Sequence, residues 1–494
     1  MKTSNMKILT NILKRYPLSP FMLVIFVFLH AYNYAYKWIL ITDLFEPLVY
    51  SIICVSIVFF ALKSILKSPL KSAIITSVFT LIFYYIGFLK DYVIKYTGSY
   101  LHLRYSLPII MIVLILMYLR FRKFNLYKVV RLNYFFNILF LIYIIVDIGI
   151  SSFNILFKKQ IKLELVNESG NTLVSKDSTQ IANKPDVYFI VLDEYASSVS
   201  LKQNYGYDNS SLDSFLISKD FYISKQSKSN YTYTIFSLAS TLNMNYFKNA
   251  VDLNFPNDFG LVWNYIYYNK VFEKFKTEGY EIKNFSFFNI NEYPASSQSF
   301  SRAWALKFLF DKSLYSVINM GYLWLDKKHY THLLENKLAE FNDVIKLKKD
   351  QPKFIYLHFL LPHHPYVFNN NGSERSVFEY TKKDENINNN YINQLIFTNK
   401  VIKYVINKIQ LSDKKKIIII EGDHGNRFYH SQNSLIKANY FSGKNDFKNL
   451  NAYYFYDKNY SQLHDSISPV NSFRIVFNQY FNEKYPLLKD SIVF

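Results

Sequence analysis

The 494-residue sequence contains a single cysteine, Cys54, which falls inside a long apolar run. One cysteine cannot form an intramolecular disulfide, so a disulfide framework is excluded, and so is a metal site built from several thiolates. Acids are also scarce, with 37 Asp and Glu against 57 Lys and Arg, which gives a formal net charge of +20. Such a charge is typical of nucleic-acid-binding proteins. Here, however, many of the basic residues lie in short loops between apolar segments, so we expect no nucleic-acid partner.

Hydrophobic residues make up 50% of the sequence and aromatic residues 19%, yet the mean hydropathy is zero. A strongly apolar part must therefore be balanced by a strongly polar part. The length is sufficient for two or three domains. The sequence predicts a transmembrane helical domain at residues 1–156, a polar linker at 157–184 and a soluble domain at 185–494.

Five apolar stretches of about membrane-spanning length precede residue 157. They are Ser19–Tyr36, Phe45–Leu66, Ala73–Leu89, Leu107–Leu119 and Leu132–Leu156. The fourth stretch is the shortest. No cleavage pattern of small residues follows the first stretch, so we expect it to be retained as a helix.

The basic residues between these stretches predict the orientation, because Lys and Arg near helix ends stay on the cytoplasmic side. Twelve lie in the N-terminus, the second-to-third loop and the fourth-to-fifth loop: Lys2, Lys7, Lys14, Arg15, Lys63, Lys67, Lys71, Arg120, Arg122, Lys123, Lys128 and Arg131. The alternate loops hold four: Lys37, Lys90, Lys95 and Arg104. We therefore expect a multi-pass protein of the bacterial plasma (inner) membrane, with its soluble domain on the periplasmic or extracellular side. One helix fewer would reverse this orientation.

Two ionisable residues, His30 and Asp147, lie within the apolar stretches. An ionisable group is costly there and usually turns toward a cavity or a partner. Two interpretations stay open: both residues lie near the membrane interface, or they help to admit a lipid substrate.

Beyond Pro185, short β-rich runs alternate with helical patterns. Strands are predicted at 187–192, 281–287, 354–360 and 416–420, and helices at 212–217, 271–280 and 391–409. Buried apolar strands that alternate with helices indicate an α/β domain with a largely parallel central sheet. Functional side chains in such sheets gather at the carboxyl ends of the strands.

Three of the predicted strands carry or lead into acids or imidazoles. These side chains are Asp193 and Glu194, His358 and His363, and Asp423 and His424. Carboxylates and imidazoles brought to one sheet edge suit a divalent cation such as Zn or Mn. A single acid at a strand end often only caps the next helix, but three such ends together favour a metal site.

The segment Ser229–Asn243 offers the hydroxyls of Thr232, Thr234 and Ser237 just before a helical pattern. A Thr hydroxyl is a weak nucleophile, but a bound cation activates it and a helix N-terminus stabilises the resulting anion. The alternative is a hydroxyl-rich helix cap without chemistry. The acids elsewhere in the domain favour a nucleophile.

Four motifs occur in order: LDEY at 192, SNYTYTIFSLASTLNMNY at 229, HFLLPHHPY at 358 and EGDHGNR at 421. Together they resemble the sulfatase-like branch of the alkaline phosphatase superfamily, over roughly residues 185–480. With five helices in front, the chain resembles the lipoteichoic acid synthases and the lipid A phosphoethanolamine transferases. This resemblance implies an alkaline-phosphatase-like α/β fold after the transmembrane helices.

The resemblance also implies roles for individual residues. It places a nucleophile that also ligates the metal on Thr234, and further metal ligands on Asp193, Asp423 and His424. Glu194 is the neighbour that some members use in place of the first ligand. The resemblance places a substrate-contacting histidine on His363 and a further active-site histidine on His358. His430, after the DHG motif, corresponds to another histidine that could ligate the metal.

Two departures from the family patterns bear on the chemistry. Sulfatases convert a Cys or Ser in a CxPxR-like motif to formylglycine, whereas Thr234 stands there without the Pro or the Arg. The phosphoethanolamine transferases also use disulfides, which this chain cannot form internally. We therefore expect a metal-dependent phospho-group transferase with a membrane lipid donor and a glycan or lipid acceptor. The alternatives are a sulfatase or phosphodiester hydrolase of the same superfamily, and a non-catalytic membrane protein that binds a glycan or partner.

Overall fold

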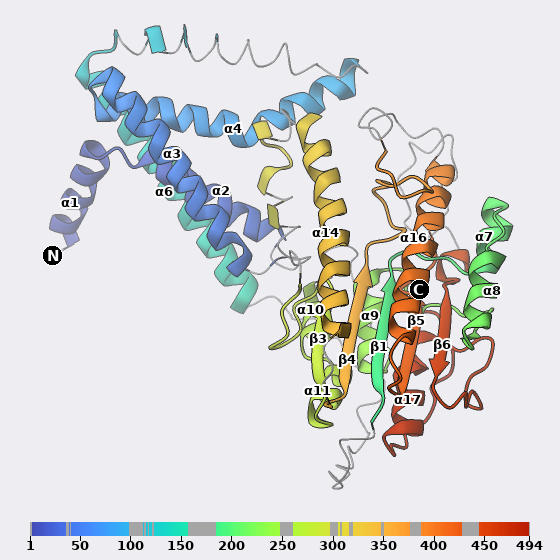
Figure 1. The fold of residues 1–494 in the computed structure, drawn as a ribbon. Helices are drawn as coiled ribbons and strands as arrows, with labels where there is room; N and C mark the ends of the chain where they lie inside the picture. The colour runs from blue at the N-terminus through green and yellow to red at the C-terminus, as the bar shows by residue number, and fades with distance from the viewer. Residues whose placement is uncertain are drawn as a thin grey trace. The chain divides into compact units, whose positions relative to one another are not determined.

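The structure is a computed structural model. It describes residues 2–35, 39, 41–97, 112, 115–116, 118–120, 123–156, 184–247, 260–296, 305–306, 309–315, 320–346, 350–375, 387–426 and 444–493. The chain forms two compact units (Figure 1). The first comprises Met1–Gln160 and Phe300–Tyr322, and the second comprises Ile161–Ser299 and Leu323–Phe494.

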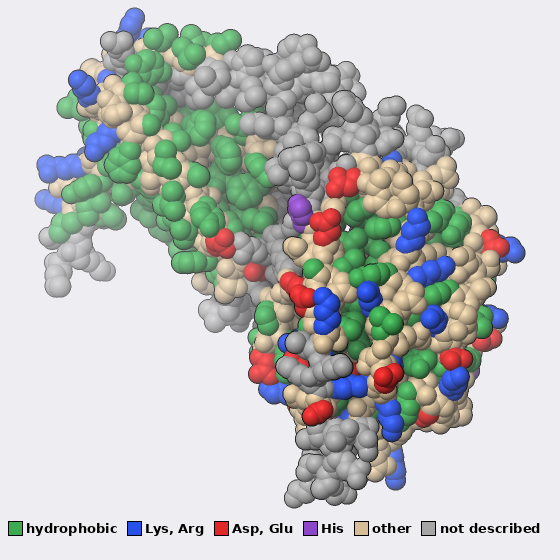
Figure 2. Space-filling model, viewed as in Figure 1, with side chains coloured by type: hydrophobic (Ala, Val, Ile, Leu, Met, Phe, Trp, Pro, Cys, Tyr) green, Lys and Arg blue, Asp and Glu red, His purple; other side chains and the backbone are tan. Residues whose placement is uncertain are grey.

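The first unit is helical. Its elements are α1 (Lys2–Arg15), α2 (Ser19–Ala35), η1 (Ile41–Leu44), α3 (Phe45–Leu66), α4 (Pro69–Thr97) and α6 (Leu126–Leu156). Figure 2 shows hydrophobic side chains over much of the visible surface of this unit. Ile57 and Ile145, for example, are 64% and 59% exposed. Large apolar side chains on the outside of a helical bundle are expected where lipid replaces water.

Within the part of the chain that the structure describes, three helices are long and apolar enough to cross a membrane: Ile41–Leu66, Pro69–Phe88 and Leu126–Phe153. Helices α1 and α2 meet this criterion only as a pair, which is bent by 104° and adds a fourth span if it counts as one. The predicted stretch Leu107–Leu119 lies largely outside the described residues, so the count of five spans stays a prediction. The predicted stretches at α2, α3, α4 and α6 are helices, as expected.

The apolar stretch Pro69–Phe88 of α4 is more buried than that of its neighbour: 56% of it is buried, against 11% for Ile41–Leu66. A later segment of the chain packs on α4. The backbone N–H of Gly87 donates to the carbonyl of Lys312 at 2.8 Å, and a Cβ on Gly87 would lie 2.7 Å from the Lys312 backbone. The Lys312 ammonium also pairs with Asp91 at 2.7 Å. The glycine therefore permits the close approach that joins this segment to the membrane helices.

The second unit is an α/β domain around one six-stranded sheet (Figure 1). Its strands are β1 (Asp186–Leu192), β2 (Tyr222–Ile223), β3 (Glu281–Phe285), β4 (Lys353–Phe359), β5 (Lys416–Gly422) and β6 (Asn451–Phe455). The sheet order is β2-β6-β5-β1-β4-β3, with β3, β4, β1 and β5 mutually parallel and β6 antiparallel to β5. The predicted α/β fold with a largely parallel sheet is confirmed.

Helices cover both faces of the sheet. They are α7 (Ser198–Tyr205), α8 (Ser210–Ser218), α9 (Thr234–Asn243), α10 (Gly260–Tyr267), α11 (Lys270–Thr277), α14 (Met320–Lys346), α16 (Ile387–Gln410) and α17 (Ser472–Tyr480), with short 3₁₀ turns η4 (Lys444–Phe447) and η5 (Pro469–Asn471). On one face, Ile190 and Leu357 share a core cluster with residues of α7, α8, α14 and α16. On the other, Phe189 packs on Phe473 of α17, and Phe354 stacks on Phe275 of α11. Alternate residues of each strand thus serve opposite layers.

Candidate metal and nucleophile site

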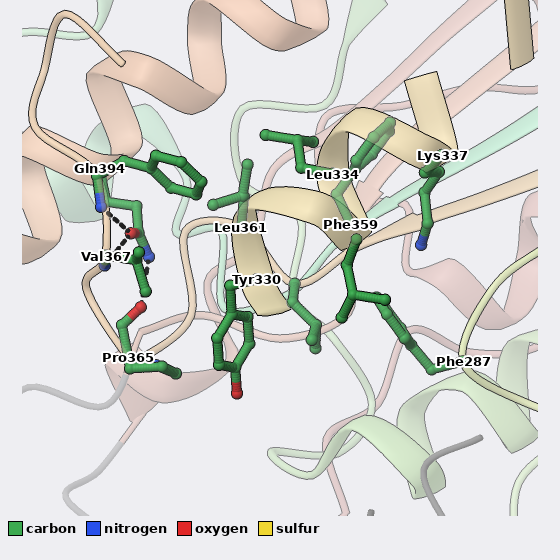
Figure 3. A pocket seen from close by; sticks show the side chains of 12 residues that line it. Phe287, Tyr330, Leu334, Lys337, Phe359, Leu361, Pro365, Val367 and Gln394 are labelled. Atoms are coloured by element: carbon green, nitrogen blue, oxygen red, sulfur yellow. Dashed lines mark hydrogen bonds between the residues drawn. The ribbon is translucent and has the colours of Figure 1, made fainter. Parts of the chain in front are cut away.

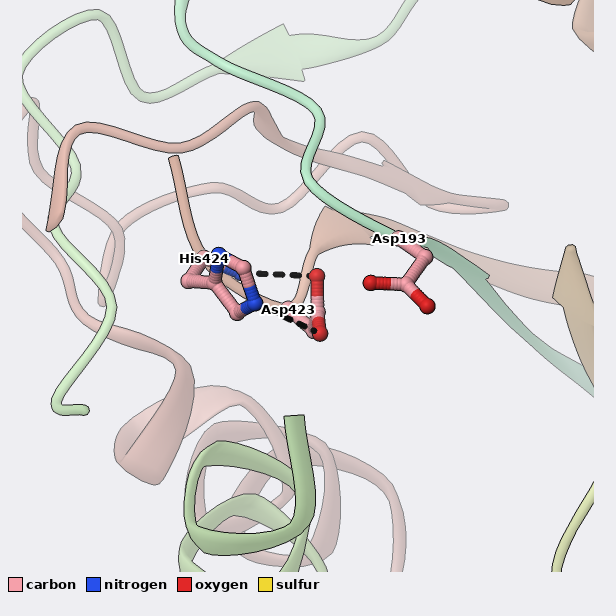
Figure 4. A group of neighbouring side chains, drawn as sticks. All are labelled: Asp193, Asp423 and His424. Carbon is pink, nitrogen blue, oxygen red and sulfur yellow. Dashed lines mark hydrogen bonds and ion pairs between the residues drawn. The ribbon is translucent and has the colours of Figure 1, made fainter. Parts of the chain in front are cut away.

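The carboxyl ends of β1 and β5 bring the acids together. These strands are parallel neighbours with Leu192 opposite Gly422, so the residues that follow them emerge side by side. One potential ligand atom from each of Asp193, Asp423 and His424 lies within 4.8 Å of the other two (Figure 4). We call these three residues the triad. All three side chains are buried. The sequence prediction of a shared sheet edge is therefore met for these residues.

Thr234 is the first residue of α9, and it faces this group. Its Oγ1 donates to Oδ1 of Asp193 at 3.4 Å. Ser237, one turn later, instead donates to the backbone carbonyl of Asp423 at 2.5 Å and so ties α9 to the end of β5. Of these two hydroxyls, Thr234 therefore contacts a carboxylate of the triad, and Ser237 holds the helix in place. Thr232, the third candidate, is buried just before the helix.

The two carboxylates have opposite tendencies to ionise. Burial raises the pKa of Asp193 well above its usual range, and the neighbouring charge of Asp423 raises it further. Burial also acts to raise the pKa of Asp423, but the imidazoles of His424 and His358, the Thr234 hydroxyl and the backbone N–H of Glu194 outweigh it and lower the pKa. A cation between the two would relieve the repulsion that now favours a proton on Asp193.

The donor set fits a divalent cation. Oδ2 of Asp423 is buried and has no hydrogen-bond partner, which is costly unless a ligand supplies one. Nδ1 of His424 lies 2.8 Å from the carbonyl of Gly425, which leaves Nε2 on the side of Asp423, 3.4 Å from Oδ2. A second contact of this kind orients a metal-binding imidazole. Two carboxylates and one imidazole suit Zn or Mn.

The remaining predicted histidines differ in their access to solvent. His358, on β4, is buried, and its Nε2 has no hydrogen-bond partner. Burial lowers the pKa of His358 to about 3, so its ring is neutral near pH 7. The His363 side chain is 36% exposed, and its Nε2 lies 3.8 Å from Oε1 of Glu194. His430 lies outside the described residues.

Glu194 contributes its backbone to the site. It has a left-handed conformation with φ 59°, which is strained for a residue with a Cβ, and its N–H donates to Oδ1 of Asp423 at 2.9 Å. The phenol of Tyr391, on α16, donates to the Glu194 carbonyl at 2.9 Å and holds this turn. Sequence reasoning missed Tyr391, because no local pattern shows that a helix some 200 residues later reaches this turn.

Gly422 is a second residue that sequence reasoning did not single out. A Cβ at this position would lie 2.3 Å from the Tyr195 carbonyl, closer than any side chain tolerates. The absence of a side chain therefore lets the ends of β1 and β5 approach and brings Asp423 next to Asp193. The glycine before DHG in the EGDHG motif was the available signal.

A small cavity of about 30 Å³ lies beside the end of β4 (Figure 3). Its lining is mostly apolar, with Leu334 of α14 and Phe359 of β4 among the contributors. Lys337 of α14 is the cation in this lining. Its Nζ lies 3.8 Å from the centre of the Phe287 ring and donates to the backbone carbonyl of His358. Lys337 therefore anchors the strand segment that carries His358.

The fold and this site together define a class of protein. The class is that of the sulfatase-like α/β domains. Here the sheet brings buried acidic and imidazole side chains to adjoining strand ends, with a hydroxyl beside them at a helix start. The family model described as Sulfatase matches residues 185–473, which is more than half of the chain. The chain belongs to this family.

Several solved structures are similar to the chain. They include the integral membrane lipooligosaccharide phosphoethanolamine transferase A of Neisseria meningitidis, with 11% identity and a TM-score of 0.39 over 83% of this chain and 82% of that one. The periplasmic domain of phosphoethanolamine transferase EptC from Campylobacter jejuni has 15% identity and a TM-score of 0.39, over 62% and 92%. The periplasmic domain of Escherichia coli EptC, in complex with Zn, has 12% identity and a TM-score of 0.38, over 64% of this chain and 85% of that one. A comparison with curated protein sequences gives no match.

Proposed function

We propose that the chain is a membrane-anchored, metal-dependent phospho-group transferase that uses Thr234 as its nucleophile and passes the group from a membrane lipid to a lipid or glycan hydroxyl. The observation that carries this proposal is the position of Thr234. Its hydroxyl is at the start of α9, 3.4 Å from Asp193, in a buried triad that suits a divalent cation. The apolar helices of the first unit would hold such a site near its lipid donor, outside the plasma membrane.

In the first step, Oγ1 of Thr234 attacks the phosphorus of a phosphodiester. The new Oγ1–P bond replaces the P–O bond to the lipid, and the lipid alkoxide leaves with that electron pair. The hydroxyl proton of Thr234, which forms a hydrogen bond with Oδ1 of Asp193, is released to bulk water. The partial positive charge at the start of α9 favours the negative charge that develops on the phospho-group.

In the second step, an acceptor hydroxyl attacks the phospho-threonine, the Oγ1–P bond breaks, and Thr234 recovers a proton from bulk water. His363 is the better candidate to protonate the lipid alkoxide in the first step and to take the acceptor proton in the second. Its side chain is 36% exposed, so leaving group and acceptor can reach it, whereas His358 is buried. We therefore assign no proton transfer to His358, which would be a positioning residue.

Asp193, Asp423 and His424 would hold the cation, with Thr234 as an additional ligand. When bound, a divalent cation supplies positive charge that lowers the pKa of the hydroxyl and offsets charge on the phosphoryl oxygens. Glu194 is the neighbouring carboxylate, 3.8 Å from His363, and it would orient that imidazole.

Intact-mass spectrometry of the full-length protein tests the nucleophile. The protein is incubated with lipids that carry a phosphoethanolamine or phosphoglycerol head group, and the expected product is a phospho-group adduct that fragmentation maps to Thr234. Thr234→Ala should lose the adduct and slow transfer by at least about a thousandfold, whereas Thr232→Ala serves as the matched control. An adduct on another residue, or transfer that survives in Thr234→Ala, would overturn the proposal.

The match to the sulfatase family favours one second candidate, a hydrolase of sulfate or phosphate esters. Water would then replace the lipid or glycan acceptor. Release of sulfate from an aryl sulfate by the wild-type protein, lost in Thr234→Ala, would support this activity. A protein that contains no Zn or Mn, and whose Thr234→Ala variant leaves cell-envelope lipids and glycans unchanged, would instead be a non-catalytic binder.

A further inference from the structure

A polar cluster joins α2 to α6 inside the membrane unit. His30 and Asn33 come from α2, and Asp147 and Ser151 from α6. Nδ2 of Asn33 donates to Oδ1 of Asp147 at 3.1 Å and to its backbone carbonyl at 2.8 Å. Oγ of Ser151 donates to Oδ1 of Asn33 at 2.5 Å. Nδ1 of His30 lies 3.4 Å from Oδ1 of Asp147.

The carboxylate of Asp147 is incompletely satisfied in this cluster. Asp147 is 3% exposed, and its Oδ2 is buried with no hydrogen-bond partner. Among the residues that the structure describes, no Lys or Arg lies within ion-pair distance of it, and His30 is the partner. A carboxylate among apolar helices is costly without a compensating cation or proton. A ligand that brings hydrogen-bond donors and a positive charge would therefore satisfy Oδ2 of Asp147.

The cluster has the chemistry of a primary-ammonium site. Asp147 Oδ2 is an open acceptor, and the oxygens of Asn33 and Ser151 lie around the same carboxylate. An ammonium group offers three N–H donors and one charge, whereas a quaternary amine has no N–H to donate. The access route lies at His30, whose side chain is 59% exposed on a helix of the lipid-facing bundle. An ammonium group that replaced the His30 imidazole beside Asp147 would supply the hydrogen-bond donors that the carboxylate of Asp147 lacks.

We propose that Asp147, Asn33, Ser151 and His30 bind the primary ammonium head group of a membrane lipid. This site is separate from the triad, since α2 and α6 belong to the first unit and the triad to the second. It does not depend on phospho-group transfer. A lipid is the expected source because the exposed side of His30 is on a helix of the apolar bundle, where bilayer lipid is the expected neighbour. The site is expected near one membrane surface, because His30 lies in the last two turns of α2.

The test measures lipid retention by the full-length protein in phosphatidylcholine nanodiscs that contain a minor share of phosphatidylethanolamine or of its N-methylated and N,N-dimethylated forms. Native mass spectrometry then counts the lipids that stay bound. Retention should fall with each N–H replaced, with about a tenfold preference for the unmethylated lipid over phosphatidylcholine. Asp147→Asn should abolish the preference, and Asp43→Asn, a carboxylate outside the cluster, should keep it.

Two outcomes would overturn the assignment: equal retention of all four lipids by the wild-type protein, or an unchanged preference in Asp147→Asn. Displacement of the lipid by soluble ethanolamine at millimolar concentration would also do so, because the site would then recognise a free amine. If Asp147→Asn fails to fold, the wild-type protein is crosslinked to a photoactivatable phosphatidylethanolamine, and the crosslinked segments test the proposal. Crosslinks should map to Ser19–Ala35 and Leu126–Leu156, and crosslinks confined to other segments would contradict the proposal. Thr234→Ala should retain the lipid preference, which separates this test from that of the transferase.

Discussion

The phenol of Tyr391 donates a hydrogen bond to the backbone carbonyl of Glu194 at 2.9 Å, across the interface between α16 and the end of β1. Glu194 is one of the non-glycine residues with positive φ, and its N–H binds Asp423. A buried tyrosine outside the triad thus holds the turn that presents the first strand-end acid to the second. The geometry of the triad depends on contacts made behind it as much as on its own side chains.

Tyr391→Phe should weaken both the fold and the metal site. The phenol also accepts from the backbone N–H of Ala196 at 3.2 Å, so its loss leaves a buried donor and a buried acceptor without partners. Each such group costs about 1–3 kcal/mol. We expect a lower free energy of unfolding and weaker binding of Zn²⁺, measured by thermal unfolding and calorimetry.

The matched control for this variant is Tyr404→Phe on the same helix. The Tyr404 side chain is 39% exposed and bonds Asn342 near the surface, so its loss should change stability by less than about 0.5 kcal/mol and leave metal affinity unchanged. Equal effects from the two tyrosine variants would refute a specific role for Tyr391.

Gly422→Ala should be among the most damaging small substitutions in the second unit. The new Cβ would lie 2.3 Å from the Tyr195 carbonyl, and backbone on both sides would have to move. Overpacking of this kind costs about 1–3 kcal/mol or more, and the movement would separate Asp423 from Asp193. Melting temperature and metal content should both fall. Gly149→Ala, where nothing lies within 4 Å of the added Cβ, is the control and should keep the metal content of the wild-type protein.

Metal affinity should fall as the pH is lowered. A proton on Asp193 competes with the cation for the same oxygens, and burial raises the pKa of Asp193 well above its usual range. Competition therefore starts at a higher pH than for an ordinary aspartate. Titration with Zn²⁺ from about pH 8 to about pH 5 should show progressive loss of affinity with proton release on binding, and Asp193→Asn should bind weakly at every pH. An affinity that stays constant over this range in the wild-type protein would contradict the assignment of Asp193 as a ligand.

Sequence reasoning identified what depends on local pattern. The apolar runs that became β1, β4 and β5 predicted the strands, and the acids that follow β1 and β5 were expected at one edge because parallel strands share their carboxyl ends. Of the three candidate nucleophiles, Thr232, Thr234 and Ser237, the resemblance to a family selected Thr234. The antiparallel strand β6, between β2 and β5, and the helix α14 were not predicted. Contacts between distant segments, such as Tyr391 with Glu194 and Lys337 with His358, leave no local signal because they depend on how layers pack.

Lys337 lies buried between Phe287 and the end of β4. Burial lowers the pKa of Lys337 from 10.5 to about 7. Between these two values the unfolded chain binds more protons than the folded chain, so the free energy of unfolding should rise with pH across this window. In Lys337→Met this rise should flatten, because the residue that titrates differently in the two states is gone. Unfolding followed at several pH values, with Lys346→Met as the exposed control on α14, measures the slope, and identical slopes in the wild-type protein and Lys337→Met would show that Lys337 keeps its ordinary pKa in the folded chain.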